Sequence, residues 1–86
     1  MMRPARGVGV VDDEVCVYVA SLPDGPILVL DGPSALAWRT ACTRGADAVS
    51  QVVAEATGED AGTIAPYLER FLSDLVDRGL LVRAAE

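Results

Sequence analysis

The sequence contains no histidine, and its two cysteines, Cys16 and Cys42, stand apart with no Cys-x-x-Cys pair. Without histidine, a serine or cysteine nucleophile lacks its usual general base, so acid–base chemistry would fall to carboxylates. The Asp and Glu residues lie mostly in expected turns and on expected solvated helix faces, and none has an obvious partner beside it. We therefore expect a protein that is not an enzyme, with both cysteines reduced.

Two short motifs that could suggest a bound cofactor lack the rest of their pattern. The acidic run at 12–14 does not have the spaced ligands of a calcium loop. No helix is expected after Gly7 and Gly9, as a dinucleotide fingerprint would require. We expect no metal and no cofactor.

Basic runs and long apolar runs are also absent. The net charge is −6 and the arginines are scattered, so nucleic acid and anionic membrane surfaces should repel the chain on average. No apolar stretch approaches the roughly 18 residues that a transmembrane helix needs, and the N-terminus lacks the apolar block of a signal peptide. We expect a cytoplasmic protein that binds neither nucleic acid nor membrane.

The first third of the sequence is typical of β structure. Segments 7–11, 15–22 and 27–31 are rich in β-branched and other apolar residues. Asp24-Gly25, between two prolines, indicates a tight turn. Because the connections are short, the three segments predict an antiparallel meander with 27–31 as an edge strand.

The run Ile-Leu-Val-Leu at 27–30 does not alternate apolar and polar residues as a half-buried strand normally does. We expect Leu28 and Leu30 to face the core beside Trp38. The free edge and the opposite face would then be left for something outside the chain.

After Asp31 the sequence takes a helical period. Helices are expected at 33–44, 47–57 and 64–78, each followed by a glycine. Thr63 is expected to cap the third helix, which places Pro66 in the first turn, where its missing N–H costs nothing. The apolar tail is expected to pack as a short strand or extended segment.

The expected fold is therefore a single α+β domain, residues 1–86, with an ordered core at about 8–82. A three-stranded antiparallel sheet precedes three helices, in the order βββααα. The tight turn between the last two helices resembles a winged helix-turn-helix with an attached sheet.

The third helix has two distinct faces. A core stripe recurs at helical spacing and consists of Ile64, Leu68, Leu72 and Leu75. The flank beside it carries two aromatic and two charged residues, Tyr67, Phe71, Asp74 and Arg78. Such a flank can be a core boundary, or it can be one wall of a groove whose other wall is the edge strand 27–30. Arg70 would lie at the periphery of that groove.

Two segments, 28–38 and 67–82, together resemble the PqqD-like family, the RiPP recognition elements of ribosomal natural-product biosynthesis. In this family a strand ends in Leu-Asn or Leu-Asp before a helix that starts with small residues and continues to a large apolar residue followed by a polar one. The corresponding residues here are Leu30, Asp31, Ala35, Trp38 and Arg39. The last helix of the family has spaced apolar residues and ends in Gly-Leu-Leu, matched by Leu68, Phe71, Leu72, Leu75, Gly79, Leu80 and Leu81. The resemblance covers roughly residues 8–82, but Tyr67 stands where the family often has an acidic residue.

The resemblance implies a non-catalytic, winged-helix-like domain that binds the leader segment of a precursor peptide. The leader would add as a strand antiparallel to the third strand, wedged against the third helix. The expected peptide-binding residues are Ile27, Leu28, Val29, Leu30 and Asp31 on the strand and Tyr67, Arg70, Phe71, Asp74 and Arg78 on the helix. Stand-alone domains of this kind serve a leader peptidase and a cyclase in lasso peptide pathways, which the small acidic chain fits best, or act as peptide chaperones for radical-SAM maturases.

Two other readings remain open. A winged-helix DNA-binding regulator has the same helix order, but the third helix, with Glu69, Asp74 and Asp77 against Arg70 and Arg78, is a poor recognition helix for phosphate. A purely structural subunit would fill the same groove with a partner protein or a second copy.

Overall fold

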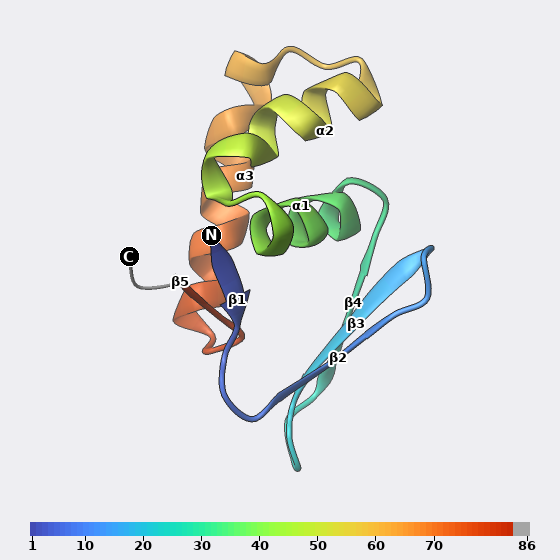
Figure 1. Cartoon of the computed structure of the whole chain (residues 1–86), viewed down its shortest axis with the longest axis vertical. Helices are drawn as coiled ribbons and strands as arrows, with labels where there is room; N and C mark the ends of the chain where they lie inside the picture. The colour runs from blue at the N-terminus through green and yellow to red at the C-terminus, as the bar shows by residue number, and fades with distance from the viewer. Residues whose placement is uncertain (84–86) are drawn as a thin grey trace.

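The protein has an α+β fold in which a three-stranded antiparallel sheet precedes three helices (Figure 1). A computed structural model describes residues 1–83, so the last three residues of the expected 1–86 domain lie outside the described part. The elements follow in the order β1 (Met2–Pro4), β2 (Val8–Asp12), β3 (Cys16–Ser21), β4 (Ile27–Asp31), α1 (Gly32–Thr43), η1 (Ala46–Ala48, a 3₁₀ turn), α2 (Val49–Thr57), α3 (Ala61–Asp77) and β5 (Leu81–Arg83). The expected order of strands and helices is confirmed.

The three-stranded sheet has the order β2-β3-β4, and both pairings are antiparallel, as the short connections predicted. Val17 and Val19 of β3 are fully buried, and they pair with Leu30 and Leu28 of β4. These four side chains therefore lie on the face that meets the helices, because alternate residues of a strand share a face. The prediction that Leu28 and Leu30 face the core is confirmed.

A second, two-stranded sheet joins β1 to β5 and was not expected. Met2 pairs with Arg83 and is only 3% exposed, and Leu81 is fully buried. The ordered structure therefore begins before residue 8, where the expected core started. The expectation of a short strand at the C-terminal end is confirmed by β5.

The glycines end the helices as expected. Gly45, Gly58 and Gly79 have φ angles of 101°, 77° and 77°, a left-handed region that residues with a Cβ rarely adopt. The backbone N–H of Gly58 donates to the carbonyl of Ala54 at 2.8 Å and closes the last turn of α2.

The expected start of the third helix is wrong. Asp60, not Thr63, is the N-cap of α3, and its Oδ2 accepts a hydrogen bond from the backbone N of Thr63 at 3.0 Å. The helix begins at Ala61, so Pro66 lies inside it rather than in its first turn. Because proline has no N–H, the carbonyl of Gly62 loses its usual helical partner.

Helix α1 connects the sheet to the other two helices (Figure 1). It packs against β3 and β4 on one side and against α2 on the other, and Trp38 on it is 4% exposed. Helix α3, in contrast, packs mainly on α2 and β5 rather than along β4. In residues 1–83, no helix is both long and apolar enough to cross a membrane.

Candidate functional site

The edge strand β4 presents two different faces. Leu30 is 4% exposed and Leu28 is half-buried, whereas Ile27 is 68% and Val29 is 52% exposed. Within residues 1–83, β4 pairs with β3 alone, and no loop donates a backbone hydrogen bond to its other edge. The strand therefore offers unpaired backbone groups to any extended segment that can approach them.

A cleft of about 280 Å³ opens beside the beginning of β4. Its lining combines residues of the β3–β4 region with the C-terminal end of α3 and the residues after it, namely Ser21, Pro26, Ile27, Leu28, Arg78 and Leu80. Leu80 is 7% exposed and belongs to the core, so the cleft has an apolar floor. An apolar side chain of a strand added to β4 could enter here.

Arg78 supplies the charged group at this cleft. Its Nε donates to Oδ2 of Asp74 at 2.9 Å, one helical turn earlier, and both side chains are more than half exposed. An exposed pair of this kind is weak and readily exchanges partners. The guanidinium is therefore available for a carboxylate of a ligand.

The structure brings together only part of the expected site. Ile27 and Leu28 lie at the cleft with Arg78, while Tyr67 is 74% exposed on α3 and does not line it. Phe71 is half-buried and packs against the core.

The other expected residues do not line the cleft. Arg70 and Asp74 are exposed on α3, and Asp31 is the N-cap residue of α1 at the far end of β4. Val29 and Leu30 are on β4 but do not line the cleft. The roles of all these residues in binding stay predictions.

Three lining residues were not predicted as site residues, although one of them had a signal in the sequence. Leu80 follows Gly79 in the Gly-Leu-Leu ending of the last helix, and the Schellman-type bond from its backbone N to the carbonyl of Leu75 at 2.9 Å turns it back toward the core. Ser21 and Pro26 flank the β3–β4 turn and had no such signal.

A larger cleft, of about 420 Å³, lies on a different part of α3, against α2, η1 and β5. Its lining includes Asp47, Glu69, Ser73 and Arg83 and contains none of the expected site residues. Its mixed charge and open polar rim do not indicate a particular ligand.

Comparisons of the chain with known proteins found no relative. No protein-family model, no characterised protein and no solved structure matches the chain significantly.

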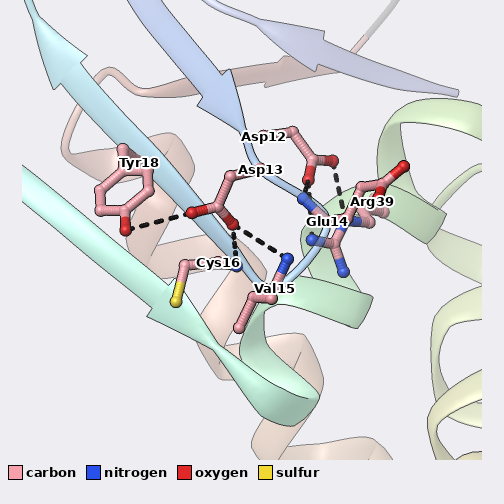
Figure 2. Close-up of polar contacts among 7 residues, drawn as sticks. All are labelled: Asp12, Asp13, Glu14, Val15, Cys16, Tyr18 and Arg39. Atoms are coloured by element: carbon pink, nitrogen blue, oxygen red, sulfur yellow. Dashed lines mark hydrogen bonds and ion pairs between the residues drawn. The ribbon is translucent and has the colours of Figure 1, made fainter.

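The acidic turn between β2 and β3 has a structural explanation (Figure 2). Oδ1 of Asp12 accepts a hydrogen bond from Nη2 of Arg39 and Oδ2 accepts one from Nε, both at 2.8 Å, so the pair is bidentate. Asp13 Oδ1 accepts from the backbone N atoms of Val15 at 2.9 Å and Cys16 at 2.6 Å. These carboxylates fix the turn and connect it to α1, which also carries Trp38 under the sheet.

The same contacts lower the pKa of both carboxyl groups. The hydrogen bond from Arg39, together with one from the backbone N of Glu14, lowers the pKa of Asp12 from 3.8 to about 2. Backbone hydrogen bonds from Cys16 and Val15 lower the pKa of Asp13. Both groups are therefore ionised at neutral pH and committed to protein donors.

Substitution of Arg39 by glutamine should reduce stability in a pH-dependent way. Because the folded pKa of Asp12 lies below its ordinary value, the pair stabilises the fold fully above about pH 4 and loses this contribution as the pH falls to about 2. We expect R39Q to have a lower urea midpoint than the wild type at neutral pH, and the two midpoints to converge toward pH 2. Arg44→Gln, at the C-terminal end of the same helix, is the matched control and should show little difference at either pH. A constant difference across this range would contradict the assignment.

Proposed function

We propose that the protein is a non-catalytic recognition domain that binds the leader segment of a ribosomally made precursor peptide by strand addition to β4. The observation that carries the proposal is the apolar edge of β4, which has no pairing strand within residues 1–83 and opens onto the cleft at the end of α3. Strand addition draws affinity from backbone hydrogen bonds and specificity from pockets for alternate side chains. An exposed apolar edge strand favours aggregation, and a bound strand would remove that risk by covering the edge.

The direction of β4 predicts how such a strand would lie. In an antiparallel addition, the C-terminal side of the bound segment passes Ile27 and Leu28 and reaches the cleft. There an apolar side chain would contact Leu28 and Leu80, and Arg78 would meet an acidic residue. The exposed ring of Tyr67 would contact a residue of the leader that lies outside the cleft.

We further propose that the domain is of the winged helix-turn-helix type and delivers the leader to a separate leader peptidase and cyclase in lasso peptide biosynthesis. The resemblance of segments 28–38 and 67–82 to RiPP recognition elements supports this assignment. So does the arrangement of three antiparallel strands before three helices.

Amide chemical shifts would test the proposal. We expect a synthetic leader, taken from a short precursor identified by a search of the neighbouring genes, to shift the amide signals of residues 27–31 and 67–78 in ¹H–¹⁵N spectra. A scrambled leader of the same composition is the control and should leave these signals in place. Shifts confined to α2, residues 49–57, would overturn the proposed site.

A further inference from the structure

The outer face of the three-stranded sheet, which points away from the helices, is apolar in a way that strand addition does not explain. A sheet with one face on the core normally carries polar residues on its other face. Here the register places Val11 opposite Tyr18 and Tyr18 opposite Val29 in one row across the sheet. The next row pairs Gly9 with Ala20 and Ala20 with Ile27.

We call this surface the outer patch; it consists of Val11, Tyr18, Ala20, Leu22, Ile27 and Val29. Leu22 belongs to it because its Cδ1 occupies the space above Gly9, where a Cβ would come within 2.9 Å. Four of the six side chains are more than half exposed: Val11 at 62%, Leu22 at 61%, Ile27 at 68% and Val29 at 52%. Threonine would give the same β propensity on a solvated face, so propensity alone does not account for the apolar character.

The charge around the outer patch is mainly acidic. Arg6, which precedes the Gly7 whose carbonyl accepts from the backbone N of Leu22, and Arg78, in the cleft beside Ile27, are the basic residues near it. Residues 7–31 contain five acidic residues and no lysine or arginine, which gives this segment −5 of the chain's net −6. Asp13 lies beside the patch, with its Oδ2 3.4 Å from the hydroxyl of Tyr18 (Figure 2). Asp31 pairs with Cys16 in the row next to Tyr18 and Val29. Of the five, Asp12 is compensated by Arg39 from α1.

From this combination we infer that the outer patch docks a second protein, one whose contact surface has an apolar centre rimmed by lysine and arginine. Charge complementarity selects this occupant, because an acidic rim attracts a basic one and repels its own copy. The area of the outer patch also favours a partner with a basic rim over a second copy. Three strands of about five residues cover only about 250 Å², against about 800 Å² per partner in a standard interface. A partner must therefore also contact the rim, where a second copy would meet like charge.

The outer patch shares Ile27 and Val29 of β4 with the proposed leader site, but its other residues lie outside that site. The leader adds to the edge of β4, whereas Val11 is on β2, at the opposite side of the sheet. Substitutions at Val11 and Leu22 therefore test the outer patch without touching the proposed leader site.

A pair of synthetic peptides provides the test. One alternates leucine and lysine and the other leucine and glutamate, so both present the same apolar face with opposite charge. We expect the leucine–lysine peptide to shift the amides of residues 9–12, 17–22 and 27–29 and the leucine–glutamate peptide to leave them unchanged. Binding should weaken as ionic strength rises.

The double variant Val11→Thr/Leu22→Thr should weaken binding of the leucine–lysine peptide about five-fold, since it removes exposed apolar area from the patch. Val15→Thr is the matched control, because Val15 is 72% exposed but lies in the turn between β2 and β3. Thermal unfolding and leader binding should be unchanged in the double variant, which separates this inference from the proposed function.

Three outcomes would overturn the inference. Equal binding of both peptides would remove the role of charge, and shifts confined to the α2–α3 cleft would place the site elsewhere. A dimer in light scattering that the double variant dissociates would show that the occupant is a second copy.

Discussion

Methylation of single backbone nitrogens in the leader peptide should weaken its binding strongly at every second residue and change it little at the residues between. A strand added to β4 uses the N–H of every second residue toward the protein, while the N–H groups between them point to solvent. A methyl group on a backbone nitrogen that points toward β4 removes a hydrogen bond and leaves a carbonyl of β4 without its partner. We expect affinity to fall about 10- to 100-fold for each such position. Methylation of a backbone nitrogen that points to solvent should change the affinity little.

The alternation is the diagnostic result, and isothermal titration calorimetry over a series of singly methylated peptides would reveal it. A helical ligand seated against α3 would instead lose affinity at consecutive methylated positions, because each methyl group disrupts a helix. A ligand held only by side chains would lose none. Either pattern would exclude strand addition to β4, but neither would contradict the fold described above.

The elements that could be predicted from sequence are those with local causes. Each strand of the three-stranded sheet is a run of β-branched or apolar residues that ends at a turn, and the glycines that end the helices occupy positive-φ positions. The faces of α3 were also predictable from spacing, since Leu72 and Leu75 are buried and Glu69 and Ser73 are exposed. Such signals need no knowledge of the rest of the chain.

The features that were missed depend on distant or competing partners. Strand β1 is three residues long and is a strand only because β5 pairs with it from the other end of the chain. Asp60 and Thr63 are both good helix caps, and the sequence favoured Thr63 because Pro66 suits a first turn. The pairing of Asp12 with Arg39 joins residues 27 positions apart.

The residues that line the cleft could be predicted from the sequence only in part. Spacing places Tyr67, Phe71, Asp74 and Arg78 along one side of α3, but it does not determine how the helix is oriented to β4. That orientation follows from the packing of α3 on α2 and β5, and the cleft beside β4 is lined by the C-terminal end of the helix.

The four apolar residues of Ile27–Leu30 should separate into two classes when they are substituted. Leu30 is 4% exposed within the core, so Leu30→Ala should lower the free energy of unfolding by about 2–5 kcal/mol. Val29 is 52% exposed on the outer face, and Val29→Ala should cost no more than about 1 kcal/mol, chiefly through lost β propensity. Urea unfolding of both variants followed by circular dichroism would measure the difference.

The two neighbours serve as each other's control, because they share a strand, a backbone environment and a large apolar side chain. Sequence alone could not assign them, since a uniformly apolar run fits a strand covered on both faces as well as one covered on a single face. A large loss for Leu30→Ala with a small loss for Val29→Ala would show that the chain itself covers only one face. Equal large losses would mean that Val29 is buried in solution, which would remove the free outer face together with any docking there. The stability of these two variants therefore decides, before any ligand is found, whether the strand has a surface to offer.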